Sequence, residues 1–393
     1  MGRIVKTTCL LLLGLGVLGF ESAEVVYDEC KGKPENAVCS EYAGKDAGRA
    51  KNVILMIGDG MGVNQVFAAR VQANGPGEPL ALESLPRRAL VTTCSRSGYT
   101  DSAAAATALA TGHKAFVKDI STSPEGQEYE TLLELAQKLG KNAGLVTTAD
   151  ITDATPAAFG AHVPARKERQ GVAEDYLGQT RPELLLGGGR HEFPAPLLSR
   201  ARAEGYAIVY NLPELNRLDP MKSPRVLGLF AEDNLTYEAD RPPDSSEPRL
   251  REMAGFALER LSRDPDGFFL MIEAGLIDHA CHLGKLDKAI AEVLEFNAAV
   301  ETVLAWMGNR ADTLLIVTAD HETGGLTIAG DHYQKGDTVK AKFTTKTIPG
   351  VPALHSKQRV PLFALGPNSA AVKDHLDNTA VYCLVRNALL PPE

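Results

Sequence analysis

Acidic and imidazole side chains follow several short apolar runs of the sequence, at the point where each run ends. The set comprises Asp59 within Gly58-Asp59-Gly60, Asp153 with Thr155, Glu273 with Asp278, and Asp320 beside His321. Because the carboxyl ends of parallel strands share one edge of a sheet, we expect these groups to converge there. Carboxylates at such close range repel one another and resist ionisation unless divalent cations are bound among them. Mixed His and Asp ligands suit zinc, whereas oxygen ligands suit magnesium.

The spacing of Asp278 and His282 supports this metal hypothesis. The two residues are four positions apart, which places both side chains on one face if the segment is helical, ready for a single ion. A cap, a turn or a surface charge is a sufficient explanation for one loop aspartate taken alone. It does not explain the whole set.

Ser102 is the candidate nucleophile. It follows Tyr99-Thr100-Asp101 and precedes an alanine-rich run that predicts a helix. A serine at a helix N-terminus most often serves only as the cap. However, the unpaired backbone amides there attract an anion, and a neighbouring metal ion would lower the pKa of the hydroxyl without any histidine base.

Arg166 is the candidate anion-binding group. Taken alone it is explained as a solvated surface arginine, but near the predicted metal ions its guanidinium suits bidentate binding of phosphate oxygens. It would supply local positive charge that the chain otherwise lacks, since the formal net charge is -9. That acidic balance argues against electrostatic binding to nucleic acid or to an anionic membrane.

The elements that must position these groups alternate between strand-like and helical patterns. Strands are expected at Val53 to Ile57, Ala89 to Thr93, Ala143 to Thr147, Phe268 to Ile272, Thr313 to Thr318 and Val360 to Leu365, and the main helices at Gln65 to Val71, Ala103 to Ala110, Pro156 to Ala161, Leu286 to Met307 and Asn378 to Leu389. The alternation predicts an α/β fold, with a mostly parallel central sheet flanked by helices on both faces. Two regions break the rhythm and are interpreted as excursions from the sheet, Leu218 to Arg251 and Thr327 to Pro352.

The first residues resemble a secretion signal. Arg3 and Lys6 precede an apolar run from Cys9 to Phe20 that is short for a membrane span. We therefore expect a signal peptide over residues 1–23 and a secreted or periplasmic protein. The final residues, Leu389 to Glu393, lack the hydrophobic tail of a lipid-anchor signal, so no stable membrane anchor is expected.

Cysteine usage fits export. Cys30 and Cys39 lie close together in the polar segment 24–50, which predicts a local disulfide in an oxidising compartment. The remaining mature cysteines are scattered and are interpreted as small buried thiols: Cys94, Cys281 and Cys383.

Several motifs in one order resemble the alkaline phosphatase family. They are Val53 to Gly62, Asp101-Ser102, Thr152 to Pro156, Glu273 to His282 and Thr318-Ala319-Asp320-His321. The likeness runs from about Lys51 to the final helix. It implies a single catalytic domain over 51–390, a short crown-like insertion at about 323–352, and a homodimer.

The resemblance also implies two Zn²⁺ and one Mg²⁺ per subunit. The first zinc would be held by Asp278, His282 and His355. The second would be held by Asp59, Asp320 and His321. Magnesium would be held by Asp59, Thr155 and Glu273, so that Asp59 bridges two metal ions.

The implied reaction is hydrolysis of small phosphate monoesters to an alcohol and inorganic phosphate, through a phosphoserine on Ser102. Arg166 would hold the phosphate, oriented in part by Asp101. Two positions that vary within the family are Asp153 and His279 here. Asp153 favours a magnesium-bound water in the third metal site, and His279 would contact phosphate through water.

Two other classes of function remain as alternatives. Phosphodiesterases and sulfatases share this metal-edge architecture by resemblance, but Cys94-Ser95-Arg96 lacks the proline-containing context of a sulfatase's modified cysteine, and Arg166 suits a terminal phosphoryl group. The second alternative is an exported protein that only binds phosphate or metal.

Overall fold

The computed structural model describes residues 35–390, except 46, 47, 49, 220–224, 346–350 and 352. The predicted signal peptide over 1–23, most of the segment 24–50, and Cys30 lie outside the described residues. Within the described ranges, no helix is long and apolar enough to cross a membrane.

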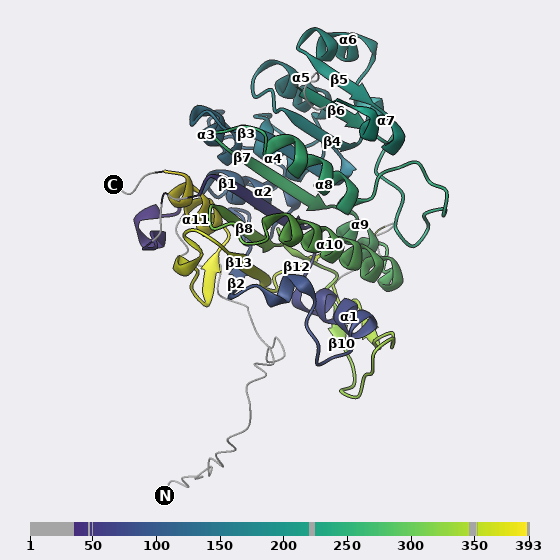
Figure 1. Ribbon diagram of the computed structural model, residues 1–393. Helices are drawn as coiled ribbons and strands as arrows, with labels where there is room; N and C mark the ends of the chain where they lie inside the picture. Colours follow the sequence, from purple (N-terminus) through teal and green to yellow (C-terminus); the bar gives the residue numbers. More distant parts are fainter. Residues whose placement is uncertain are drawn as a thin grey trace, which may run out of the picture.

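A ten-stranded sheet forms the centre of the molecule (Figure 1). In spatial order its strands are β14 (His375–Asp377), β2 (Arg87–Thr92), β13 (Val360–Leu365), β8 (Thr313–Thr318), β1 (Asn52–Gly58), β7 (Phe268–Ala274), β3 (Asn142–Asp150), β4 (Leu184–Gly188), β6 (Arg225–Leu229) and β5 (Tyr206–Val209). Neighbouring strands pair in parallel, except that β13 runs antiparallel to both β2 and β8. The predicted mostly parallel sheet is therefore confirmed.

Helices pack in two groups, and both groups contact the central strands β3 and β7. One group contains α1 (Val63–Ala73), α8 (Leu250–Leu261), α9 (Leu276–His282) and α10 (Leu286–Met307). The other contains α2 (Ser102–Thr111), α3 (Leu132–Lys138), α4 (Ala154–Gly160) and α11 (Thr379–Leu389). The sheet thus has helices on both faces, as the alternating pattern predicted (Figure 1). Three further helices, α5 (Arg169–Gly178), α6 (Ala195–Ala203) and α7 (Leu212–Arg217), accompany the β4–β6–β5 end of the sheet.

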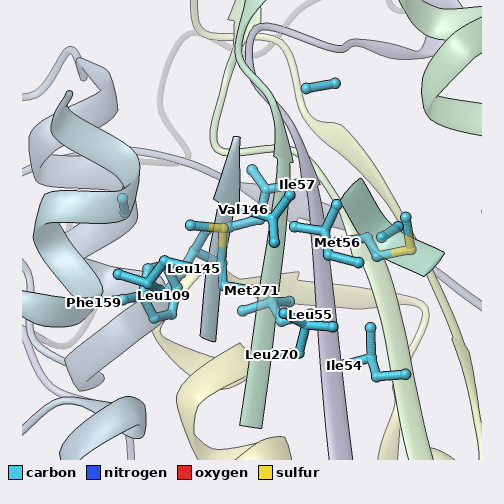
Figure 2. Close-up of a cluster of buried hydrophobic side chains, with 14 of the residues drawn as sticks. Ile54, Leu55, Met56, Ile57, Leu109, Leu145, Val146, Phe159, Leu270 and Met271 are labelled. Carbon is cyan, nitrogen blue, oxygen red and sulfur yellow. The ribbon is translucent and has the colours of Figure 1, made fainter. Parts of the chain in front are cut away.

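The core explains why β1 and β7 read as continuous apolar runs. Every residue of both strands is buried, because strands covered on both faces lack a solvent side. Figure 2 shows side chains of β1, β7 and β3 in one cluster with Leu109 of α2 and Phe159 of α4. This packing makes the strands a rigid support for the residues that follow them.

One of the two predicted excursions was wrong in part. The region from Leu218 to Arg251 contains β6, which pairs with β4 on one side and β5 on the other. The strand spans only Arg225–Leu229, and the charged and proline-rich residues around it hid its short apolar run. The described residues of the second region lie outside the main sheet as predicted, and β10 (Thr327–Ile328) pairs there with β11 (Ala341–Lys342).

The predicted Cys30–Cys39 disulfide is also wrong, because Cys39 is bonded to Cys383 of α11, 344 positions away. The short helix η1 (Cys39–Tyr42) packs on α11, so tertiary packing brings distant cysteines to bonding distance. Cys94 is also disulfide-bonded rather than a free thiol. Cys281 is free and buried, as predicted.

Candidate active site

The carboxyl edge of the sheet gathers the predicted metal ligands. Strands β8, β1 and β7 are adjacent and parallel, and they are followed by Asp320 with His321, by Asp59, and by α9 with Asp278. Because β13 is antiparallel, its beginning lies at this same edge, and β12 (His355–Ser356) directly precedes it. The convergence expected from the sequence is therefore present.

The first group consists of Asp278, His282 and His355, whose ligand atoms lie within 4.8 Å of one another. Asp278 Oδ2 is 3.2 Å from His282 Nε2, and Asp278 Oδ1 is 3.6 Å from His355 Nε2. The two Nε2 atoms are 3.0 Å apart. Asp278 and His282 share a face of α9, as their spacing predicted.

Backbone carbonyls orient both imidazoles of this group. The Nδ1 atom of His282 lies 2.6 Å from the carbonyl oxygen of Ala353, and that of His355 lies 2.9 Å from the carbonyl oxygen of Thr100. A carbonyl only accepts, so each Nδ1 carries a proton and each neutral ring directs an Nε2 lone pair toward Asp278. Two such lone pairs facing each other require a proton or a cation between them. Carbonyl-oriented imidazoles of this kind are typical of metal ligands.

The second group consists of Asp59, Asp320 and His321, all buried. His321 Nε2 is 3.1 Å from Asp320 Oδ2 and 3.6 Å from Asp59 Oδ1. Neither of these carboxylate oxygens has a hydrogen-bond partner among the described residues. Burial raises the pKa of Asp320 to about 7, and burial with the charge of Asp320 raises that of Asp59 well above its ordinary value. A divalent cation would satisfy the unpaired oxygens and offset this repulsion.

Oxygen ligands form the third predicted set. Glu273 of β7 and Thr155 of α4 are buried, and the backbone amide of Asp59 donates to the carbonyl of Ala274, 3.2 Å away. Burial raises the pKa of Glu273 to about 8, although Thr147 Oγ1 donates to Glu273 Oε2 at 2.5 Å. The Thr155 hydroxyl has no partner in the described part of the chain. These residues fit a hard cation such as magnesium.

Ser102 lies beside the second group. It is the first residue of α2 and is buried, and its Oγ is 3.3 Å from His321 Nε2. The helix cap is Asp101, whose Oδ1 accepts from the amide of Ala104 at 3.0 Å. Since a neighbour caps the helix, the alternative explanation of Ser102 as a cap does not hold. The Ser102 hydroxyl therefore lies at the helix N-terminus without serving as the helix cap.

Two carboxylates hold Arg166 in place. Its NH1 donates to Asp101 Oδ2 at 3.3 Å, and its NH2 donates to Asp153 Oδ1 at 3.1 Å. Burial opposes the guanidinium charge, but the charges of Asp153 and Asp101 outweigh it and raise the pKa of Arg166. Because Asp101 also caps the helix of Ser102, the arginine and the serine are positioned by one shared residue.

His279 is oriented by an asparagine that the sequence did not identify. The amide of Asp150 donates to Asn234 Oδ1 at 2.9 Å, which leaves Asn234 Nδ2 to donate to His279 Nδ1 at 3.1 Å. The proton of a neutral His279 ring is therefore on Nε2, which lies 4.0 Å from Asp153 Oδ2. Asn234-Leu235-Thr236 has the pattern of an N-glycosylation site. Both the oxygen and the nitrogen of the Asn234 side-chain amide are, however, already hydrogen-bonded.

The two groups of candidate metal ligands are linked by Thr323. Its hydroxyl donates to Asp278 Oδ1 and lies 3.3 Å from His321 Nδ1. The His321 ring also stacks on that of His355, with centroids 3.7 Å apart. Thr323 follows His321 by two positions. A threonine at that spacing does not by itself indicate a role in the site, so the sequence alone could not identify it.

Arg169 is a second guanidinium that the sequence reasoning missed. Its NH1 donates to Asp150 Oδ2 at 2.6 Å, and its NH2 donates to Asp153 Oδ1 at 3.1 Å. Asp150 also lies close to His191 and Glu192 in a group that could hold a metal ion. Its Oδ2, however, already accepts a hydrogen bond from Arg169. The sequence Arg166-Lys167-Glu168-Arg169 reads as an ordinary charged surface, so only the fold reveals the contact.

Comparisons with known proteins agree with this geometry. A family model described as Alkaline phosphatase matches residues 50–348. The chain is 37% identical to Alkaline phosphatase 3 of Bacillus subtilis (strain 168) over 72% of this chain and only 63% of that relative's length. It is 35% identical to Alkaline phosphatase H of Pseudomonas aeruginosa (strain UCBPP-PA14), over 87% of this chain and 85% of the relative. A histidine-to-aspartate mutant of TAB5 alkaline phosphatase, solved with Mg bound in its M3 site, is similar with a TM-score of 0.75 and 26% identity, covering 87% of this chain and 99% of that chain.

Proposed function

Because the chain belongs to the alkaline phosphatase family, we propose that it hydrolyses phosphate monoesters to an alcohol and inorganic phosphate. One observation carries this proposal: Ser102 Oγ lies 3.3 Å from His321 Nε2 within a buried, acidic metal-ligand cluster. A serine hydroxyl aimed at such a cluster suits nucleophilic attack, because no other base is needed. The guanidinium of Arg166 beside it suits a phosphoryl group.

We propose two Zn²⁺ and one Mg²⁺ as the cofactors. Asp278, His282 and His355 would hold one zinc, and Asp59, Asp320 and His321 the other. Asp59, Thr155 and Glu273 would hold magnesium, which is supported by their all-oxygen donor set and by the magnesium recorded in the TAB5 mutant. When bound, the metal ions would supply Lewis acidity that lowers the pKa of the serine hydroxyl and of water and stabilises the leaving oxygen.

The residues of the chain then divide the work of two displacements. In the first, Ser102 Oγ bonds to phosphorus while the bond to the alcohol oxygen breaks, leaving a phosphoserine. In the second, a water oxygen bonds to phosphorus and the bond to Ser102 breaks. Over the two steps the leaving alcohol takes up a proton equivalent to the one that Ser102 loses, and a proton from water restores the Ser102 hydroxyl. Arg166, held by Asp101 and Asp153, binds two oxygens of the phosphoryl group in both steps. His279 directs Nε2–H toward Asp153 and the phosphate through water.

A chelator experiment tests the proposal against its alternatives. Turnover of p-nitrophenyl phosphate is compared with that of a phosphate diester and a sulfate ester, before and after chelation and after return of zinc and magnesium. We expect monoester turnover that disappears with chelation and returns with metal. Ser102→Ala should abolish it, whereas Ser199→Ala, at an exposed helix position whose hydroxyl donates to the backbone carbonyl of Ala195, should not. An inactive, metal-loaded wild type would favour a binding protein, and faster diester or sulfate ester turnover would favour the related hydrolases.

We further propose that the protein is secreted or periplasmic and that it is a homodimer. The Cys39–Cys383 disulfide supports an oxidising compartment. Sedimentation equilibrium tests the dimer, with a single-chain mass as the contradicting result. Fractionation of expressing cells tests export, and recovery only from the cytoplasm would contradict it.

A further inference from the structure

One carboxylate oxygen of Asp153 accepts three hydrogen bonds. Its Oδ1 accepts from Arg166 NH2 at 3.1 Å, from Arg169 NH2 at 3.1 Å, and from the backbone amide of Ala154 at 2.8 Å. Asp153 is 7% exposed, so little water can solvate its charge. Two guanidiniums therefore share one buried carboxylate oxygen next to the proposed phosphate position.

Arg169 is anchored independently of Arg166. It is the first residue of α5, and its NH1 donates to the buried Asp150 at 2.6 Å. Asp150 Oδ1 in turn accepts from the amide and the hydroxyl of Thr152, both at 2.8 Å. Arg169 is thus held toward Asp153 by Asp150, whereas Arg166 is held by Asp101.

The sharing matters because Asp153 competes with phosphate for Arg166. A carboxylate at hydrogen-bond distance from Arg166 satisfies one of its nitrogens and repels an incoming phosphate dianion. A second guanidinium on the same oxygen weakens that hold and offsets the negative charge. The dianion then meets an Asp153 whose charge Arg169 offsets in part, because Arg169 also pairs with Asp150. The bond from Arg166 to Asp153 is weakened, so that donor is more easily exchanged for a bond to a phosphoryl oxygen.

We propose that Arg169 is a positioning residue that sets phosphate affinity by neutralising Asp153, leaving Arg166 available to the phosphoryl group. This inference rests on the proposed function. Arg169 acts through Asp153 and is not itself a catalytic residue. Its loss therefore weakens the binding of phosphate and of phosphate monoesters more than it changes turnover at saturation.

The first test is Arg169→Met, which keeps the aliphatic stem and removes the charge. The inhibition constant of inorganic phosphate and the KM for p-nitrophenyl phosphate should each rise about five- to tenfold, while kcat stays within about twofold. Arg169→Lys should recover only part of the affinity, because one ammonium cannot bridge Asp150 and Asp153 as a planar fork does. Arg263→Met, which removes a similarly exposed arginine paired with Glu259, is the matched control and should change neither constant. Unchanged phosphate affinity in Arg169→Met would overturn the proposal.

A double-mutant cycle with Asp153→Asn, measured at saturating magnesium, tests the route of the effect. In the Asn background the loss of phosphate affinity caused by Arg169→Met should be at least about threefold smaller than in the wild type, because Asp150 loses its partner in both backgrounds and only the Asp153 charge differs. Equal losses in both backgrounds would overturn the proposal, since the arginine would then act on phosphate without Asp153. Calorimetric titration of each metal-loaded protein with inorganic phosphate gives affinity without turnover, so an inactive wild type would refute the proposed function alone. Thermal unfolding confirms that each variant is folded.

Discussion

Glu322 joins the segments that carry two of the candidate metal ligands, His321 and His355. It is fully buried and directly follows His321, in β9 (Glu322–Thr323), which pairs antiparallel with β12 (His355–Ser356). Its Oε1 accepts from Gln65 Nε2 at 2.7 Å and from the amide of Leu326 at 2.9 Å. Its Oε2 accepts from the amide of Gly325 at 2.9 Å and from the Ser356 hydroxyl. We predict that Glu322→Gln weakens zinc binding without removing any ligand.

The magnitude follows from those four hydrogen bonds. A glutamine of the same shape keeps one accepting oxygen for Gln65 and Leu326 and turns an NH₂ group toward Gly325 and Ser356. The Ser356 hydroxyl can accept from this NH₂, so the bond from the Gly325 amide is the one that is lost. Each lost bond to a buried carboxylate costs about 1.5–3 kcal/mol. The metal-free variant should therefore unfold with a free energy about 1.5–3 kcal/mol lower than that of the wild type. Because His321 and His355 lose a shared support, zinc affinity should fall about 10- to 100-fold.

Zinc affinity is measured by competition with a chromogenic chelator, and stability by urea unfolding of the metal-free protein. Glu301→Gln is the control, since Glu301 is an exposed residue of α10 that accepts one bond from Asn297 at 2.9 Å. It should change neither quantity by a measurable amount. Wild-type zinc affinity in Glu322→Gln would refute the reasoning, even if stability fell.

Three further predictions concern stability and geometry. Removal of the bridge between Cys39 and Cys383, which are 344 positions apart, by Cys39→Ser should lower the free energy of unfolding by about 3–5 kcal/mol; a wild-type urea midpoint in this variant would contradict this. Burial opposes protonation of His162, but its ion pair with Glu134 at 3.2 Å outweighs this and raises the pKa of His162. The charged imidazole therefore stabilises the fold at pH values below the ordinary histidine pKa. This contribution is lost as the pH rises through the raised pKa. The urea midpoint should therefore fall more over that interval in the wild type than in His162→Asn, and parallel pH profiles would show that the pair does not contribute. Gly60 has φ +71°, and a Cβ there would lie 2.9 Å from the Cα of Asp278 in α9. Because α9 would have to shift, Gly60→Ala should lower zinc affinity at least about tenfold, measured by chelator competition. Wild-type zinc affinity in this variant would contradict the close packing.

Long, strongly patterned elements were predictable from the sequence. The expected limits of the helix Leu286–Met307 and of the strands Thr313–Thr318 and Val360–Leu365 agree with α10, β8 and β13. Buried strands show as unbroken apolar runs, and the polar residues that end them locate the active edge. By contrast, β6 was missed because five residues between charged segments carry too little pattern.

Contacts made only by the tertiary fold were not predictable. The proximity of Cys30 and Cys39 in sequence suggested the wrong disulfide, because the partner of Cys39 is brought to it by the packing of α11. Nothing in the sequence singles out Arg169 or Asn234 as part of the site, yet each bonds a residue of the candidate site. Their roles depend on where two loops meet, and no spacing along one sequence records that.

The central claim is that Ser102 is the nucleophile. The most direct measurement is to mix the metal-loaded protein with a phosphate monoester, quench in acid, and locate any phosphoryl group by peptide mass spectrometry. A phosphoserine on the peptide that contains Ser102, present in the wild type and absent in Ser102→Ala, is the predicted result. Sustained turnover by Ser102→Ala, or a phosphoryl group on another residue, would contradict the claim.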